Sequence, residues 1–256
     1  MQRLSLAWLL LALLVGTPAW PATREGLACE MPTDLIVPSA PLDNVAAALR
    51  KGSLNILALG SGSTVGDSGG SGGPALKVQT PEHSFPYQML EMLRSMRPGL
   101  HFNLAVRGGR SMTAEQMLPI LRRELAGKQY QLVLWQTGTV EAVHGVRPDA
   151  LRGVLQDGAD AADAARADLV LIDPQFSRFL RANADIDPYE TVLEQMASTP
   201  AVTLFHRYDL TEEWANSGQV DLERAGRELR DKTVMLLNDC LGQALAHYVL
   251  SAAAEH

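Results

Sequence analysis

The stretch Asn55-Ile-Leu-Ala-Leu59, followed at once by Gly60-Ser-Gly-Ser-Thr64, decides the fold. A nearly continuous apolar run of this length is typical of a parallel strand that is buried on both faces. The glycines and serines that follow end the strand, and open α/β sheets place their ligand sites at the ends of such strands. The stretch therefore predicts a central strand with a candidate site directly after it.

Four more apolar runs of similar length follow along the chain, each separated from the next by a segment with helical signals. The expected strands are 55–59, 101–106, 131–137, 168–172 and 201–205. The expected helices are 43–51, 84–97, 113–126, 149–165, one that begins at 187, and 236–253. Alternation of this kind predicts a three-layer α/β/α sandwich around a five-stranded parallel sheet. We expect residues 51–256 to form this domain and residues 20–50 to form an N-terminal arm.

The N-terminus has the pattern of a secretory signal peptide. Arg3 gives a positive charge, residues 4–15 are apolar apart from Ser5, and Thr17 and Ala19 place small residues at a cleavage site. We expect residues 1–19 to be removed and the protein to be periplasmic or secreted. The alternative is an uncleaved membrane anchor. No other segment approaches the roughly 20 apolar residues of a spanning helix, so no stable membrane span is expected after cleavage.

The charge and the cysteines bear on partners and on the redox compartment. The formal net charge is -7, which opposes binding to phosphate backbones, so no nucleic-acid partner is expected. The chain has two cysteines, Cys29 and Cys240, and an oxidising compartment favours a disulfide between them. The alternative is two buried free thiols.

Three blocks of special residues at successive strand ends resemble those of the SGNH/GDSL hydrolase family. The first is Gly60-Ser-Gly-Ser-Thr64, the second is Arg107-Gly108-Gly109, and the third is Trp135-Gln-Thr-Gly138-Thr-Val140-Glu141. The resemblance covers nearly all of the chain after the leader. It implies a flavodoxin-like SGNH hydrolase fold, an ester-hydrolysing ancestry, and a pocket around Gly60, Thr64, Gly108, Gly138 and Glu141.

The same resemblance leaves three functional positions without their expected side chains. Gly62 stands at the position of the nucleophilic serine, and Val140 stands where an asparagine would donate to the oxyanion. The family's Asp-x-x-His pair before the last helix is absent, because residues 233–239 contain no histidine. The activity is therefore left open.

Three substitutes for these groups are conceivable. Ser61 or Ser63 could be a displaced nucleophile, although a slip of one residue at a strand end redirects the hydroxyl. Gly66-Asp-Ser68 spells the family name, but it falls in a glycine-rich loop, so we regard the match as coincidence. Glu141 and His144 could form an acid–base pair, but His144 is more simply a loop histidine and His206 a polar cap after a strand.

The sequence thus predicts an exported, catalytically impaired or non-catalytic SGNH-like protein. Its expected partner is an acylated carbohydrate or polysaccharide, or a protein of an exopolysaccharide pathway. The alternative is an active carbohydrate esterase or deacetylase with a displaced serine.

No cofactor is expected. A nucleotide-binding reading rests on Gly60, Gly62 and Gly66, whose spacing is one residue too long, and no helix is expected to start there at once. Glu141 with His144, and His206 with Asp209, supply too few ligands for a metal ion.

Overall fold

The fold is a single parallel sheet between two layers of helices. The computed structural model describes residues 29–67 and 80–253. The strands are β1 Ser53–Gly60, β2 His101–Gly108, β3 Leu132–Gln136, β4 Asp168–Ile172 and β5 Val202–Phe205. They pair in the order β2-β1-β3-β4-β5, and every pairing is parallel. The predicted five-stranded parallel sheet is confirmed.

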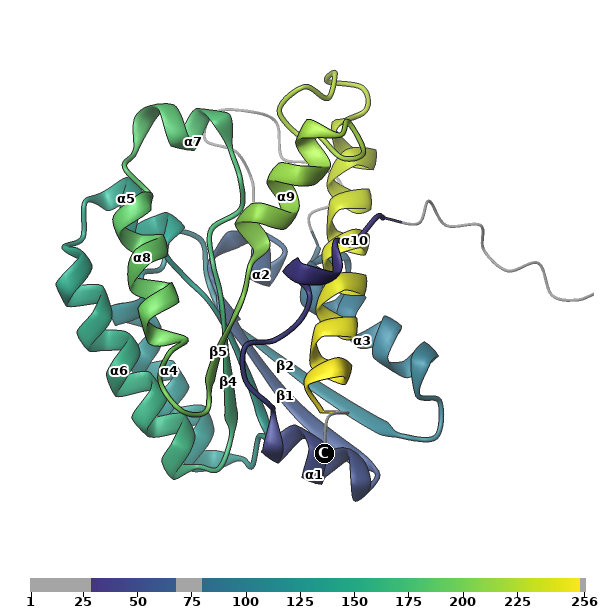
Figure 1. The fold of residues 1–256 in the computed structure, drawn as a ribbon, viewed down its shortest axis with the longest axis vertical. Coiled ribbons are helices and arrows are strands. Elements are labelled where there is room, and N and C mark those ends of the chain that lie inside the picture. Colours follow the sequence, from purple (N-terminus) through teal and green to yellow (C-terminus); the bar gives the residue numbers. More distant parts are fainter. Residues whose placement is uncertain (1–28, 68–79, 254–256) are drawn as a thin grey trace, which may run out of the picture.

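The two helical layers cover opposite faces of this sheet (Figure 1). One face packs against α1 Asp43–Arg50, α3 Phe85–Met96 and α10 Arg230–Ala252. The other face packs against α4 Ala114–Gly127, α6 Pro148–Ala164 and α8 Asp187–Met196. The predicted α/β/α sandwich is therefore confirmed.

Alternation along β1 explains why its sequence is apolar throughout. Successive side chains of a strand point to opposite faces of the sheet. Ile56 accordingly packs with the α3 and α10 layer, whereas Leu57 packs with the α4 and α6 layer. Both side chains are fully buried, so neither position tolerates a polar residue.

Four helices that follow strands β1, β3, β4 and β5 were not predicted: α2 Gly62–Val65, α5 Thr139–His144, α7 Arg178–Asn183 and α9 Arg207–Asn216. Three of them span six residues or fewer, which is too short for a helical period to show in the sequence. α9 is buried on most of its sides, so it carries little amphipathic contrast. Two short 3-10 helices, Thr33–Leu35 and Pro81–His83, complete the described elements.

The last helix begins earlier than expected. α10 starts at Arg230, whereas the apolar pattern predicted a start at residue 236. Its first turn is polar and no residue of it is buried, so the hydrophobic period does not reveal it. Residues 233–239, where the resemblance led us to look for the Asp-x-x-His pair, therefore lie inside the helix.

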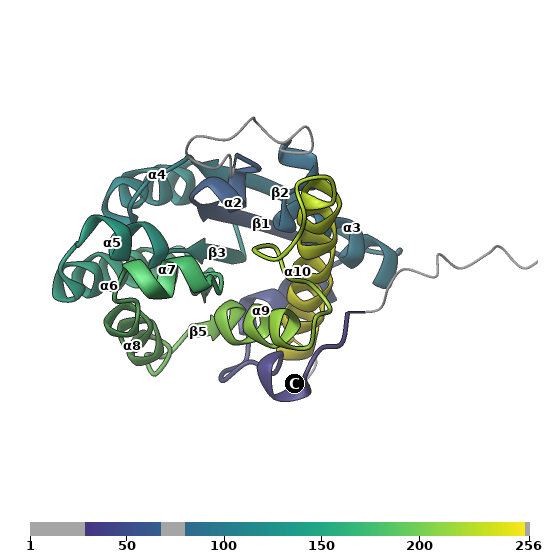
Figure 2. The ribbon, with the colours of Figure 1, turned by 90° about the horizontal axis from the view of Figure 1, so that it is seen from above.

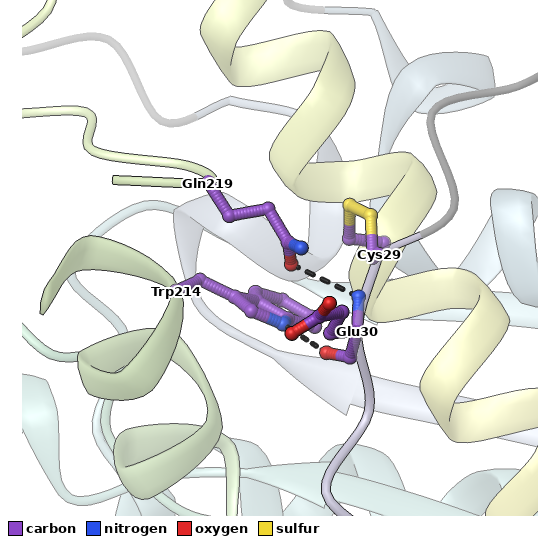
Figure 3. The surroundings of a disulfide bond; sticks show 5 residues. Cys29, Glu30, Trp214 and Gln219 are labelled. Carbon is purple, nitrogen blue, oxygen red and sulfur yellow. Dashed lines mark hydrogen bonds between the residues drawn. A yellow bond between two sulfur atoms is a disulfide. The ribbon is translucent and has the colours of Figure 1, made fainter. Parts of the chain in front are cut away.

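The arm that precedes α1 is fixed along α10. A disulfide joins Cys29 to Cys240, as the pairing of the chain's two cysteines predicts (Figure 3). The Glu30 N–H donates to Gln219 Oε1 at 3.0 Å, and Trp214 Nε1–H donates to the Glu30 carbonyl at 2.6 Å. These contacts tie the arm to α10 and to the end of α9.

Within residues 29–67 and 80–253, no helix is both long and apolar enough to cross a membrane. The predicted signal peptide of residues 1–19 lies outside the described residues.

Candidate functional site

The candidate site lies at the carboxyl ends of β1 and β3, where the strand order changes direction. The connection after β1 leads to α3 on one face of the sheet, whereas the connection after β3 leads to α6 on the other. Such a divergence opens a crevice, which is where ligands bind in this kind of sheet. Figure 2 shows α2, α7, α9 and α10 arranged around this end of the strands.

Two glycines allow the strand ends to approach one another. A Cβ on Gly60 would lie 3.0 Å from the Cβ of Gln136 and would overlap the Thr64 side chain. Gly108 has a φ of +117°, and a Cβ there would overlap the Gly60 carbonyl oxygen. Only glycine fits this backbone conformation and this space. Gly60, Thr64 and Gly108, which the resemblance places at the site, are therefore brought together.

The side chain of Gln136 joins the residues that follow β1 to the end of β3. Its Oε1 accepts hydrogen bonds from Ser61 N at 3.0 Å, Ser61 Oγ at 3.0 Å and Thr64 Oγ1 at 3.1 Å. All three side chains are buried. A backbone N–H can only donate, so the atom that it meets is the amide oxygen. An amide oxygen does not take up a proton at neutral pH, so Ser61 has no general base in Gln136.

Ser63 faces a different partner, the guanidinium of Arg207. Arg207 Nη1 donates to Ser63 Oγ at 3.3 Å, and Arg207 Nε donates to the Asp173 carbonyl at 3.0 Å. The Arg207 side chain is 2% exposed, and burial lowers its pKa to about 10. The negative charge of Asp173 acts in the opposite direction and raises the pKa of Arg207. The guanidinium therefore stays protonated at pH 7 and cannot accept a proton from the serine.

Asp173 is itself buried beside this arginine. Burial raises its pKa well above the usual range, and the hydrogen bond from the Tyr208 N–H, at 2.9 Å, acts in the opposite direction. Because the carboxylate accepts from the first turn of α9, it joins the end of β4 to that helix. Sequence analysis did not predict that Asp173 and Arg207 lie beside the site. Asp173 comes directly after β4, and Arg207 is the second residue after β5.

No described histidine is hydrogen-bonded to either serine. His83 is bonded to Thr80 at 2.9 Å, and His144 is exposed at the end of α5. His206 precedes α9, with its Nδ1 3.9 Å from Asp209. Among the described residues, neither serine therefore has the hydrogen bond to a histidine that would activate it.

The loop that precedes α10 contains acidic and basic residues but no histidine. Its residues 217–229 include Asp221 and Arg224, at the spacing where the resemblance implies Asp-x-x-His. Arg224 Nε lies 3.6 Å from Asp221 Oδ2. An arginine cannot alternate between proton donor and acceptor as a histidine does.

Glu141 has a structural partnership that excludes the suggested acid–base pair with His144. Its Oε1 accepts from the Ala114 N–H at 2.5 Å, and its Oε2 accepts from the Gly138 N–H at 2.8 Å. These N–H groups lie at the starts of α4 and α5, where a carboxylate is favoured. The carboxylate is buried and engaged on both oxygens, whereas His144 is exposed, so the two do not act together.

The remaining predicted positions lie on or beside α5. Gly138 has a φ of +96°, and a Cβ there would lie 3.0 Å from Pro174 Cγ. Val140 is half-buried on α5 and has no side-chain donor to offer an oxyanion. Whether Ser61, Ser63 and these pocket residues act on a ligand stays a prediction.

A helix does begin within the glycine-rich stretch, so the expectation of no helix there is wrong. The Ser61 carbonyl accepts from Thr64 N and Val65 N, and Gly66, with a φ of +76°, closes this single turn. Gly62 thus begins this turn and Gly66 ends it. Asp67 pairs with Arg110 at 2.8 Å, and Ser68 lies outside the described residues.

A pocket of about 320 Å³ opens next to Ser63. Its walls come from the segment after β4, from α9, from the loop before α10 and from the first turns of α10. Its apolar lining residues are Phe176, Ala215, Val220, Leu222, Val234 and Leu237. Pockets of this size and lining are typical of small-molecule sites. Among the described residues, no group of three or more His, Cys, Asp or Glu side chains is placed to hold a metal ion.

Comparison with known proteins relates this arrangement to one family. The model of the non-GDSL lipase-like family matches residues 28–255. No curated protein matches the chain.

Solved structures of esterases share the fold at low sequence identity. A two-domain esterase (CEX) active on acetylated mannans superposes with a TM-score of 0.61 at 12% identity, over 85% of this chain. The chain spans 55% of the length of that esterase. A catalytic mutant of Axe2, an acetylxylan esterase from Geobacillus stearothermophilus, gives 0.58 at 12% identity, over 79% of this chain and 95% of the other. TesA gives 0.51 at 15% identity, over 71% and 94%.

Proposed function

Because this chain belongs to the non-GDSL lipase-like family, we propose that it binds an acylated carbohydrate at the β1–β3 site without hydrolysing it as a serine esterase would. The family match and the shared fold confirm the resemblance to SGNH/GDSL-like hydrolases. The general preference of parallel α/β sheets for ligands at their strand ends supports this location, whereas the chemistry depends on individual residues there.

The observation that carries the proposal is the pair of partners that hold the two serines. Ser61 donates to the amide oxygen of Gln136, and Ser63 accepts from the guanidinium of Arg207. Neither partner can remove a proton from a hydroxyl, so neither serine is activated for attack. Gly62, at the nucleophile position of the family, has no side chain to attack with.

The choice of an acylated carbohydrate is supported by the fold relatives. One is described as active on acetylated mannans, and another as an acetylxylan esterase. A binding protein with the same strand-end crevice and without an activated serine would retain the ligand instead of releasing its acyl group.

Export and a role beside an exopolysaccharide-pathway protein belong to the same proposal. They are supported by the signal-peptide pattern of residues 1–19 and by the Cys29–Cys240 disulfide, which suits an oxidising compartment. An exported protein that binds acylated polysaccharide would meet its ligand directly.

Hydrolysis of p-nitrophenyl acetate by the protein purified from the periplasm or medium tests the chemistry. We expect the wild-type rate to equal that of a Ser61→Ala/Ser63→Ala double variant. Turnover well above the double variant, lost in Ser63→Ala alone, would instead establish the alternative of an active esterase with a displaced nucleophile.

Binding to acetylated mannan and acetylxylan, each compared with its deacetylated form, tests the ligand. We expect the acetylated forms to bind more tightly. Ser63→Met, which enlarges the side chain beside the pocket, should weaken binding, whereas Ser95→Met, on the exposed surface of α3, should not. Equal binding of acetylated and deacetylated forms would refute the proposal.

A further inference from the structure

The pocket beside Ser63 has apolar walls that an acetyl group would not fill. Its six apolar lining residues are contributed by four separate segments, and Ala215, Val220, Val234 and Leu237 are otherwise buried. A dry apolar cavity of about 150 Å³ is enough to hold a benzene molecule. At about 320 Å³, this pocket has room for a chain of roughly ten carbon atoms by the same measure.

Three of the four charged residues that line the pocket, Arg178, Asp221 and Glu223, have partners within the protein, and Arg230 is the fourth. Arg178 Nη1 contacts both carboxylate oxygens of Asp221, at 3.1 and 3.2 Å. Glu223 accepts from Ser177 Oγ at 2.6 Å and from the backbone N–H groups of Arg178 and Phe179, at 2.9 and 3.1 Å. These bonds hold the loop before α10 against the start of α7.

This internal pairing has a consequence for the ligand. Polar groups that are satisfied within the protein do not require a polar ligand to satisfy them. The apolar side chains between them therefore supply the binding surface, and the polar network keeps that surface in a fixed shape.

One end of the pocket is polar in a way that suits an ester or a carboxylate. Ser63 lies there, and its Oγ already accepts from the buried guanidinium of Arg207. The hydroxyl hydrogen of Ser63 is then directed away from Arg207 and is free to donate to a carbonyl oxygen. A molecule with a carbonyl at one end and a hydrocarbon chain behind it matches this distribution.

We infer that the acyl group recognised by this protein is a medium-length hydrocarbon chain, seated between α9 and α10 with its carbonyl at Ser63. The inference rests on the proposed function, since it names the acyl group of the same ligand. Each methylene that enters the pocket leaves water and adds binding free energy.

Isothermal titration with a series of glucose esters tests this directly, because the sugar is constant and only the acyl chain changes. The probes are the acetyl, butyryl, hexanoyl and octanoyl esters. We expect affinity to rise by about two- to fourfold for each added methylene up to octanoyl. Ala215→Leu, which fills the pocket, should weaken octanoyl binding at least tenfold and remove most of the gain in affinity from the acetyl to the octanoyl ester.

Two controls keep the outcome interpretable. Ala164→Leu makes the same change on the exposed side of α6 and should leave the whole series unaffected. Val220→Phe fills the pocket from the loop instead of from a helix, in case Ala215→Leu does not fold. Equal affinity for all four esters would overturn the inference and leave the proposed function standing, whereas a folded protein that binds none of them would overturn both.

Discussion

At the scale of the residue, the partners of each polar group decide the chemistry of the site. The sequence shows Ser61 and Ser63 where a displaced nucleophile could stand, and it shows glycine at position 62. It does not show that Gln136, 75 positions from Ser61, receives the Ser61 hydroxyl, or that Arg207, 144 positions from Ser63, donates to Ser63. Nothing in the sequence distinguishes a buried glutamine that accepts several hydrogen bonds at a strand end from a glutamine on the surface.

Gln136→Ala should destabilise the protein by about 1–3 kcal/mol, because it leaves three buried donors without an acceptor. Urea unfolding measures the loss. Gln131→Ala is the matched control. Gln131 lies just before β3, and its side-chain oxygen accepts one hydrogen bond, from the Asn55 backbone N–H. Equal losses in the two variants would contradict the role assigned to Gln136.

Glu190 gives the protein a pH-dependent stability. Burial raises its pKa from 4.5 to about 7, helped by the negative charges of Asp187, Asp209 and Glu194 and opposed by Arg181. A carboxyl group whose pKa is raised on folding binds its proton more tightly in the folded state. Its contribution to stability is therefore lost as the pH rises from about 4.5 through about 7.

Glu190→Gln should consequently be more stable than the wild type at pH 8, and this gain should shrink towards pH 4.5. Urea unfolding at the two pH values measures the difference. Glu228→Gln, which removes an exposed carboxyl from the loop before α10, should show no such trend. A gain of the same size at both pH values would show that ionisation of Glu190 is not the cause.

At the scale of the element, the strands and the amphipathic helices could be predicted, whereas the short helices α2, α5 and α7 and the largely buried α9 could not. The start of α4 has a capping box formed by Thr113 and Gln116. Such a box can be recognised in the sequence because its signal lies within four consecutive residues. α2, α5 and α7 form because each follows a strand end that must turn back across the sheet. Their stability comes from tertiary contacts more than from local propensity.

Glu141 shows how such a contact joins two elements. Glu141→Gln should cost about 1–3 kcal/mol, because one amide oxygen cannot replace two carboxylate oxygens at the starts of α4 and α5. Urea unfolding measures the cost, and hydrogen exchange should be faster at the Ala114 and Gly138 amides. Glu115→Gln, an exposed change in the first turn of α4, should leave both measurements close to wild type.

At the scale of the whole molecule, the disulfide joins positions that are 211 residues apart. A cross-link that closes so long a loop restricts the unfolded chain strongly. Cys29→Ala/Cys240→Ala should lose about 2–5 kcal/mol of stability. The melting temperature measured with and without dithiothreitol tests this, since reductant should lower it for the wild type and leave the double variant unchanged.

Export can be tested on the whole chain as well. If residues 1–19 are a cleaved signal peptide, the protein recovered outside the cytoplasm should begin at Trp20. Mass spectrometry of its N-terminal peptide measures this. Replacing Ala19 with Arg should block the cleavage, and recovery of full-length wild-type protein from the membrane would favour the uncleaved anchor.

The sequence by itself determined the alternation of strands and helices, the layered fold and the absence of a side chain at position 62. Hydrophobic period and residue identity are local properties, so a chain displays them before it folds. Only the tertiary structure decided that Ser61 faces Gln136, that Ser63 faces Arg207 and that an apolar pocket lies beside Ser63. These features join residues that are far apart along the chain, and the packing of the sheet ends and the surrounding helices brings them within hydrogen-bond distance.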